Sequence, residues 1–300
     1  MNYSEFDVVV VGAGISGCVM AERLASEGKK VLILEKRNHV GGNCYDYKNS
    51  NGILVSKYGP HIFRTEDENV WSYIKKFSKW RKYEHKVLTS VKGKLVPIPV
   101  NLTTINTLFN LELKTEDEMR DWLNSKKENF ECVDNAEKQI LNLLGKEIYD
   151  LMFKNYTLKQ WGRDPSQLDA SITARIPVRF SFDDRYYLDK YQYQPIGGFT
   201  KLLKKILKND LITVELGVSF FDVEKNFKKD QKIIFTGPID NYFRYKFGKK
   251  TKLEYRSLRF KNKLIKREFF QEKRSYANLK DPSTHEGSNS STWNCSSNRS

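Results

Sequence analysis

The chain has 300 residues, a formal net charge of +15 and a hydrophobic share of 39%. This length allows two domains, or one domain with a large insertion, and the hydrophobic share is enough for a core. No apolar run approaches the roughly 20 residues of a membrane-spanning helix. We therefore expect no membrane span. No nucleic-acid-binding motif accompanies the basic charge, so we also expect no nucleic-acid partner and lysines that mostly cover solvated surface.

The four cysteines lie far apart in the chain and form no C-x-x-C pair. This spacing indicates neither a metal site nor a disulfide framework. The first expected strand begins close to Phe6, so we expect no signal peptide. A reduced, cytoplasmic protein is the simplest interpretation. The cysteines are Cys18, Cys44, Cys132 and Cys295.

The region from Phe6 to Gly42 carries the strongest pattern in the sequence. Residues 8–11 are four valines, which predict a strand buried on both faces. The motif G-x-G-x-x-G follows directly at 12–17, and a helical apolar spacing comes after it. A second apolar run at 31–34 predicts another strand, which ends in Glu35. This order is typical of a dinucleotide-binding βαβ unit.

Each part of this pattern has a physical role in such a unit. Gly12 allows the tight turn out of the strand, and Gly14 lets the backbone approach a pyrophosphate. Gly17 lets the helix pack against the strand, while the helix N-terminus attracts the phosphates. Glu35 can accept hydrogen bonds from the ribose hydroxyls. A lone glycine motif is a weak signal, but here strand, glycines, helix and acid occur in order.

The residues after Glu35 indicate which dinucleotide binds. Arg37 is followed by Gly41, Gly42 and Asn43, a second glycine turn that lets another loop lie close to a bulky cofactor. A plain nicotinamide domain has no need of this loop. The combination resembles FAD-binding flavoproteins of the glutathione reductase and amine oxidase type. The alternative is an ordinary strand–helix connection with a glycine turn.

The next elements are short strands and one helix. A hairpin is expected around Asn51–Gly52, a helix over 66–79, and two short strands between 83 and 98 around Lys92–Gly93. His61 follows Gly59–Pro60, so we expect it on a loop, where a structural and a functional role are equally open.

From 101 to about 160 the pattern changes to helices, with Thr115 as an expected helix cap. This helical segment ends with Tyr156, Thr157 and Trp161, which suit either a helix core or a nucleotide base and sugar. Arg175 follows in the segment RIPVRF, and arginine pairs with a diphosphate in a bidentate way.

We expect the chain to return to the first domain after about residue 190. A glycine turn at 197–198 precedes a helix, and strands are expected at 214–216 and 232–235. Thr236 and Gly237 follow the last strand, where small residues suit close approach to a cofactor phosphate.

We therefore predict an α/β fold: a Rossmann-like FAD-binding domain, an inserted helical domain and a region of mixed or antiparallel sheet. The expected divisions are 1–90 plus 191–245 for the FAD-binding domain, 101–165 for the helical insertion, 166–190 plus 246–271 for the substrate-side sheet, and 272–300 for a disordered tail.

An ordered set of motifs resembles the bacterial-type UDP-galactopyranose mutases over roughly residues 6–271. The motifs are GAGISG at 12–17, EKRNHVGGN at 35–43, YGPHIFRT at 58–65, YTLKQWGR at 156–163, RIPVRF at 175–180, PIGGFTKL at 195–202, FTGPID at 235–240 and LEYRSLRF at 253–260.

The resemblance implies a flavoenzyme that interconverts UDP-galactopyranose and UDP-galactofuranose without net redox change. In this family FAD must be reduced, and its N5 atom attacks the anomeric carbon of the sugar. The resemblance further implies UDP-galactose as the small-molecule substrate, a role in cell-surface polysaccharide synthesis, and a homodimer as one option.

The resemblance also implies roles for individual residues. His61 would lie beside the flavin, Arg175 would grip the diphosphate, and Arg256 would lie near the sugar-phosphate side. His85 falls near a substrate-contacting position. The cofactor-binding set would be Gly12, Gly14, Gly17, Glu35, Arg37, Gly42, Asn43, Thr236 and Gly237. The substrate-binding set would be Tyr156, Thr157, Trp161, Arg175, Tyr186 and His85.

After Gln271 the family pattern stops, and 280–300 holds seven serines without an apolar stripe. We therefore expect a truncation or frameshift near 271, and activity weakened or lost with the missing segment. Two other functions stay open. One is an amine oxidase-like FAD oxidoreductase, and the other is a non-catalytic remnant that binds nucleotide sugars.

Overall fold

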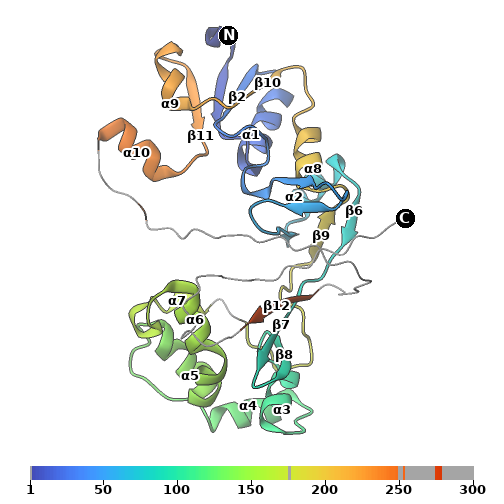
Figure 1. Cartoon of the computed structure of the whole chain (residues 1–300), viewed down its shortest axis with the longest axis vertical. Coiled ribbons are helices and arrows are strands. Elements are labelled where there is room, and N and C mark those ends of the chain that lie inside the picture. Colours follow the sequence, from blue (N-terminus) through green and yellow to red (C-terminus); the bar gives the residue numbers. More distant parts are fainter. Residues whose placement is uncertain (1, 175–176, 249–252, 254–273, 279–300) are drawn as a thin grey trace. The chain divides into compact units, whose positions relative to one another are not determined.

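The computed structural model describes residues 2–174, 177–248, 253 and 274–278. These residues form two compact units (Figure 1). Unit 1 contains the chain up to Tyr83 and resumes at Asp189, and unit 2 contains Glu84–Leu188 together with 274–278. Unit 2 is therefore inserted into the sequence of unit 1.

Unit 1 is built on a four-stranded parallel sheet with the order β10-β2-β1-β11. All residues of β1 and β2 are buried, as expected for strands covered on both faces. Helix α1 follows β1 directly, which makes the βαβ unit that the sequence predicts. The elements are β1 (Val8–Val11), α1 (Ile15–Ser26), β2 (Val31–Glu35), β10 (Ile212–Leu216) and β11 (Lys232–Phe235). The Rossmann-like fold class is confirmed.

The rest of unit 1 consists of a hairpin, a small antiparallel sheet with the order β5-β9-β6, and further helices. The hairpin pairs β3 with β4 and turns at Gly52, as the sequence predicts. These elements are η1 (Tyr3–Glu5), η2 (Gly42–Cys44), β3 (Asp46–Lys48), β4 (Leu54–Ser56), β5 (Phe63–Thr65), α2 (Glu68–Ile74), η3 (Lys75–Phe77), β6 (Trp80–Lys82), β9 (Tyr191–Pro195), α8 (Phe199–Ile206), α9 (Phe220–Val223), η6 (Glu224–Asn226) and α10 (Ile239–Phe247).

Asp46, the first residue of β3, links the segment after Gly41 and Gly42 to α8, which follows unit 2 in the sequence. Its carboxylate accepts hydrogen bonds from the amides of Phe199 (2.6 Å) and Thr200 (3.0 Å), the first residues of α8. A carboxylate at a helix N-terminus satisfies free amides and complements the helix dipole. A Cβ on Gly198 would come 2.4 Å from this carboxylate, so glycine is required there.

Unit 2 combines a three-stranded sheet, β12-β7-β8, with a set of helices. Strands β7 and β8 form an antiparallel hairpin that turns at Lys92–Gly93, as expected. The elements are β7 (Lys86–Val91), β8 (Lys94–Ile98), α3 (Leu102–Phe109), α4 (Glu116–Asn124), α5 (Ala136–Ile148), η4 (Tyr149–Phe153), α6 (Lys154–Trp161), η5 (Pro165–Gln167), α7 (Ser171–Ala174) and β12 (Arg274–Asn278).

The helices of unit 2 bury a continuous apolar core, and Thr115 caps α4 in a full capping box with Glu118. The expected helical stripe is interrupted at Gly145, whose φ is 77° inside α5. A Cβ there would meet the Lys126 carbonyl at 2.2 Å. One π-helical turn, η4, follows and leads into α6. These two irregularities set the direction of the helix that carries Tyr156 and Trp161.

Two features differ from the divisions expected from sequence. The helices of 101–165 share one unit with the β7–β8 hairpin and with residues up to Leu188. Within 272–300, residues 274–278 form β12, which pairs in parallel with β7, so these five residues depart from the expected disordered tail.

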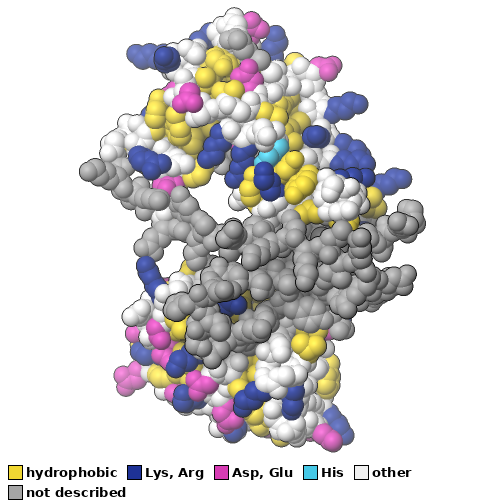
Figure 2. All heavy atoms as spheres, in the orientation of Figure 1, with side chains coloured by type: hydrophobic (Ala, Val, Ile, Leu, Met, Phe, Trp, Pro, Cys, Tyr) yellow, Lys and Arg dark blue, Asp and Glu magenta, His cyan; other side chains and the backbone are white. Residues whose placement is uncertain are grey.

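Positive charge is not gathered in one place on the face shown in Figure 2, where lysine and arginine side chains are interspersed with acidic and apolar ones. Within the described ranges, none of the helices has both the length and the apolar character needed to cross a bilayer.

Candidate functional site

The glycine motif fixes the junction between β1 and α1. Gly12 has a φ of 103°, and a Cβ on it would come 2.6 Å from the Thr236 hydroxyl oxygen. A Cβ on Gly17 would come 1.9 Å from the Gly12 carbonyl oxygen, so α1 starts in direct contact with the strand end. The Thr236 hydroxyl donates to the Val11 carbonyl at 2.8 Å. Thr236 and Gly237 thus border the same turn from β11.

The second glycine loop closes onto the first. The Gly41 amide donates to the Ala13 carbonyl at 2.7 Å. A Cβ on Gly42, whose φ is 54°, would come 3.0 Å from the Gly14 Cα. Gly14 itself has open space apart from Gly42 at 4.0 Å. Gly14, the N-cap of α1, therefore carries no side chain that would keep a pyrophosphate away from the backbone amides there.

Glu35 is buried at the end of β2 and holds both loops. Its Oε2 accepts from the Ala13 amide at 2.8 Å, and its Oε1 accepts from the Arg37 amide at 2.9 Å. Each carboxylate oxygen has a further lone pair. The carboxylate is thus held rigidly by the backbone and can still accept from two ribose hydroxyls.

Arg37 lies beside this carboxylate on the loop that follows β2. Its Nη2 donates to Asn43 Oδ1 at 3.1 Å, and its guanidinium lies 4.5 Å from the centre of the Tyr58 ring. Its Nη1 is buried and has no hydrogen-bond partner among the described residues. A buried cationic donor left unpaired is costly. The site therefore fits an anionic dinucleotide that would satisfy this atom.

His39 supports the Arg37 loop, although the sequence pattern did not single it out. Its ring stacks on Tyr45 with 3.7 Å between centres. Its Nδ1 lies 3.1 Å from the Val40 carbonyl, which can only accept, so Nδ1 carries the proton. Its Nε2 therefore accepts from the Tyr58 hydroxyl at 3.0 Å. No feature other than its place in the EKRNHVGGN motif could have indicated this role.

His61 lies in the same unit, on a loop as expected. Its Nδ1 is 2.9 Å from the Gly59 carbonyl, so the same reasoning places the proton on Nδ1 and leaves Nε2 as an acceptor. Gln194 on β9 donates to the His61 carbonyl at 2.7 Å. The rings of His61 and Phe199 meet edge-on, with 6.3 Å between their centres. The ring is thus fixed in one tautomer and one orientation.

The residues expected on the substrate side lie in unit 2. Thr157 is buried in α6, whereas Tyr156 and Trp161 on the same helix are half-buried. The Tyr186 amide donates to the His85 carbonyl at 2.7 Å, and the two rings meet edge-on. Burial lowers the pKa of His85 to about 4, so its ring is neutral at pH 7.

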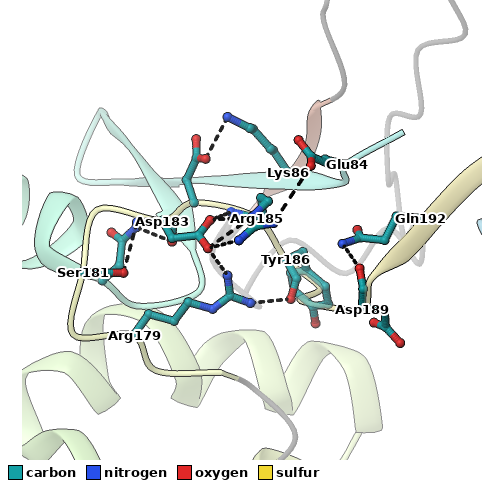
Figure 3. Close-up of polar contacts among 11 residues, drawn as sticks. Glu84, Lys86, Arg179, Ser181, Asp183, Arg185, Tyr186, Asp189 and Gln192 are labelled. Atoms are coloured by element: carbon teal, nitrogen blue, oxygen red, sulfur yellow. Dashed lines mark hydrogen bonds and ion pairs between the residues drawn. The ribbon is translucent and has the colours of Figure 1, made fainter. Parts of the chain in front are cut away.

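A network of ion pairs surrounds Asp183, close to Tyr186 (Figure 3). Arg185 binds both oxygens of the Asp183 carboxylate, with 3.0 Å from Nε to Oδ1 and 2.7 Å from Nη2 to Oδ2. These bonds lower the pKa of Asp183 to about 2. Arg179, whose side chain is 8% exposed, lies 3.5 Å from the same carboxylate and donates to the Tyr186 carbonyl at 3.1 Å. Sequence reasoning missed this role of Arg179.

The expected residues thus fall into two sets, one in each unit. The glycines, Glu35, Arg37, Asn43, Thr236 and His61 belong to unit 1, and the three residues of α6, Tyr186 and His85 belong to unit 2. Arg175 and Arg256 lie outside the described residues.

Comparison with protein families matches both parts of the sequence. The family model "GLF: UDP-galactopyranose mutase" matches residues 151–285. This match reaches beyond Gln271, where we expected the family pattern to end. A model for the NAD(P)-binding Rossmann-like domain matches residues 10–77, the region of the two glycine loops.

Among curated proteins, a UDP-galactopyranose mutase of Mycoplasma genitalium is 33% identical over 290 residues, which cover 90% of this chain and 70% of that protein. The chain belongs to the UDP-galactopyranose mutase family. A probable UDP-galactopyranose mutase of Klebsiella pneumoniae is 38% identical over 85% of this chain. A dTDP-fucopyranose mutase of Escherichia coli is 36% identical over 84% of this chain and 68% of its own length.

A solved structure agrees with the family at the level of the fold. The crystal structure of a reduced UDP-galactopyranose mutase aligns with a TM-score of 0.53 and 17% identity, over 80% of this chain and 60% of that chain. The match to the Klebsiella relative covers 65% of that protein's length. The chain thus spans about two thirds of the family members it matches.

The flavin-containing amine oxidases match only the first part of the chain. Amine oxidase B of Cavia porcellus is 42% identical over 64 residues, or 21% of this chain. This is the extent of a shared nucleotide-binding region. Membership of the UDP-galactopyranose mutase family, together with the Rossmann-like domain, supports FAD as the cofactor of the site in unit 1.

Proposed function

We propose that this protein is a flavin-dependent mutase that interconverts the pyranose and furanose forms of a nucleotide-linked sugar, with UDP-galactose as the substrate. The observation that carries the proposal is the candidate dinucleotide site of unit 1, found in a chain of this family. Glu35 accepts hydrogen bonds from the Ala13 amide in the first glycine loop and from the Arg37 amide after β2, which supports a role in holding the ribose of a dinucleotide.

In this proposal the residues of unit 1 bind FAD. The amides at the start of α1, beside Gly14, take the pyrophosphate, and Glu35 takes a ribose. Arg37 offers its unpaired Nη1 to the anionic cofactor. Thr236 and Gly237 border the turn at Gly12. Gly14 has no side chain and open space beside it, so the cofactor can approach the backbone of this turn closely.

Bound FAD in its reduced form supplies the nucleophile for the anomeric carbon of the sugar. His61 contributes a ring whose Nδ1 donates to the Gly59 carbonyl, so that Nε2 is the atom able to accept. We propose that this acceptor orients a hydroxyl or N–H group beside the flavin. The fixed tautomer makes the contact directional, since the ring cannot exchange donor and acceptor without losing the Gly59 bond.

In unit 2 the proposal assigns nucleotide contacts to Tyr156, Thr157, Trp161, Tyr186 and His85. Aromatic rings suit the uracil base, and the buried, neutral His85 can take part in neutral hydrogen bonds only. Arg175 and Arg256 would neutralise the diphosphate and the sugar-phosphate side.

A second substrate is supported by one observation. The chain is 36% identical to a dTDP-fucopyranose mutase, close to its identity with the UDP-galactopyranose mutases. The two nucleotide sugars differ in the base, in the 2′-hydroxyl of the ribose and in the sugar. The test should therefore offer both. A homodimer, a cytoplasmic location and a role in cell-surface polysaccharide synthesis stay predictions.

The test begins with the visible absorbance of the purified chain, before and after dithionite. Bands that bleach on reduction and shift when UDP is added would support a flavin and nucleotide site. Reduced protein should then be incubated with UDP-galactofuranose or dTDP-fucofuranose, and the products separated by chromatography. Formation of the pyranose isomer is the expected result.

The other outcomes separate the alternatives. Flavin and UDP binding without any isomer would favour the non-catalytic nucleotide-sugar binder. Oxygen consumption with a primary amine would favour the amine oxidase-like enzyme. A protein that binds neither flavin nor nucleotide would contradict the proposed function.

A further inference from the structure

The segment 178–186 of unit 2 is a loop whose two ends rest on different parts of the unit. At its start the Arg179 amide donates to the Val100 carbonyl at 2.9 Å. At its end the Tyr186 amide donates to the His85 carbonyl at 2.7 Å. These backbone bonds fix the ends, and the Tyr186 ring meets the rings of His85 and Tyr187 edge-on.

The Arg179 side chain reaches from the start of this loop to its end (Figure 3). Its Nη2 donates to the Tyr186 carbonyl at 3.1 Å, while its Nη1 faces Asp183 Oδ2 at 3.5 Å. The side chain is 8% exposed, so both contacts are made away from bulk water. Burial also lowers the pKa of Arg179, because removing the charged guanidinium from water disfavours its charged form.

Arginine is suited to this place because two acceptors must be reached at once. The two terminal nitrogens of a guanidinium lie in one rigid plane, whereas a lysine has a single nitrogen on a flexible stem. Asp183 balances the buried charge, and Arg185 holds that carboxylate from its other side. Arg185 itself is 37% exposed at its side chain. Arg179 and Arg185 thus both pair with Asp183, and the buried Arg179 also contacts the Tyr186 carbonyl.

We propose that Arg179 is a positioning residue for nucleotide binding: it clamps the loop and thereby fixes Tyr186 against His85. The inference rests on the proposed function, in which Tyr186 contacts the nucleotide. Arg179 acts through the Tyr186 carbonyl and does not itself touch the substrate. Loss of Arg179 therefore weakens nucleotide binding by releasing Tyr186. When the Tyr186 ring has already been removed, loss of Arg179 should weaken binding no further.

The test is a double-mutant cycle on the full-length, flavin-loaded protein, with the Kd for UDP measured by calorimetry. Arg179→Lys should raise this Kd about tenfold, and Tyr186→Ala should raise it as well. In the Tyr186→Ala background, Arg179→Lys should change the Kd less than twofold. Arg185→Gln, which removes the other arginine on Asp183, is the matched control and should change the Kd less than twofold. An equal factor from Arg179→Lys in both backgrounds would overturn the inference.

Hydrogen exchange provides a readout that needs no ligand. Arg179→Lys should speed exchange in the peptide that contains Tyr186, while Arg185→Gln leaves it within twofold. Unchanged exchange in Arg179→Lys would overturn the clamp. If the lysine variant does not fold, Arg179→Gln gives the same comparison, because it removes the buried charge along with the clamp.

These outcomes are distinct from a failure of the proposed function. Wild-type protein that binds neither UDP nor dTDP would overturn the proposed function and this inference with it. Wild-type protein that binds UDP but shows an additive cycle would overturn the inference alone. For an active enzyme, Arg179→Lys should raise KM and leave kcat within a factor of about two, since the clamp acts on nucleotide binding.

Discussion

Gly14 and Gly42 lie in contact where the two glycine loops of the candidate FAD site meet, so closely that a Cβ on Gly42 would lie 3.0 Å from the Gly14 Cα. A side chain on Gly42 would press on Gly14, whereas a Cβ on Gly14 would lie at ordinary contact distance, 4.0 Å from the Gly42 Cα. The two sequence motifs that contain them thus meet at one point of the candidate site, and the steric requirement falls on Gly42.

We predict that Gly42→Ala weakens FAD binding by at least tenfold. The new Cβ presses on Gly14, and the φ of 54° costs an alanine about 1–2 kcal/mol. Flavin absorbance retained after dialysis measures the effect. Gly52→Ala is the control, because Gly52 also has a positive φ (74°) but open space around it. Equal FAD retention by the two variants would contradict the steric explanation.

Glu35→Gln should raise the Kd for FAD about 10- to 100-fold, or about 1.4–2.8 kcal/mol. The amide replaces one acceptor oxygen by a donor, which then faces the amide of either Ala13 or Arg37. Fluorescence titration of the apoprotein with FAD measures the change. Glu27→Gln at the exposed end of α1 also removes one negative charge and should leave the Kd unchanged. A similar loss in both variants would indicate a general charge effect instead.

Asp183→Asn should destabilise unit 2 by about 3 kcal/mol, because it leaves the buried Arg179 without its balancing charge. Asp184→Asn removes the neighbouring carboxylate, which pairs with Lys86 at 2.7 Å on a more exposed surface. That change should cost less than about 1 kcal/mol. Urea unfolding followed by circular dichroism compares the two. The prediction fails if the two midpoints shift alike.

His85 should make stability depend on pH between about 4 and 6.5. Its folded pKa of about 4 lies below the ordinary value of 6.5, because burial disfavours the charged ring. The unfolded chain therefore binds a proton first as the pH falls, and stability is lost across this window, by at most about 3 kcal/mol. The wild-type free energy of unfolding should fall from pH 7 to pH 4 by more than that of His85→Gln. Parallel pH profiles for the two proteins would refute the assignment.

Asp183 contributes in a different pH range and does not obscure this comparison. Its folded pKa of about 2 lies below the ordinary 3.8, because Arg185 and Arg179 favour the charged form. Its contribution is therefore complete above about pH 4 and is lost only as the pH falls toward 2.

Local patterns allowed much of unit 1 to be predicted. The buried valines of β1, the glycine spacing and Glu35 are all encoded within one βαβ unit, so neighbouring residues determine them. The capping box at Thr115 and the hairpin at Lys92–Gly93 were predictable for the same reason. Each depends on residues that lie close together in the chain.

What could not be predicted depends on residues far apart in sequence or on geometry without a sequence signature. Asp46 caps α8, although the whole of unit 2 lies between them in the sequence, and the kink at Gly145 brings this residue so close to the Lys126 carbonyl that a Cβ would not fit. Arg179 was visible in the RIPVRF segment, but the pattern suggested a diphosphate ligand there. Its burial beside Tyr186 appears only when the loop is folded.

The insertion of unit 2 between β6 and β9 also sets an order on biosynthesis. Strand β1 leaves the ribosome first, yet its partner β11 is made only after the β7–β8 hairpin and the helices α3–α7. The contacts of those elements are mainly between residues close in sequence, so they can form before β11, the edge strand of the nucleotide-binding sheet, has been synthesised. In the nascent chain, four consecutive valines must therefore stay protected from aggregation until translation has passed Phe235.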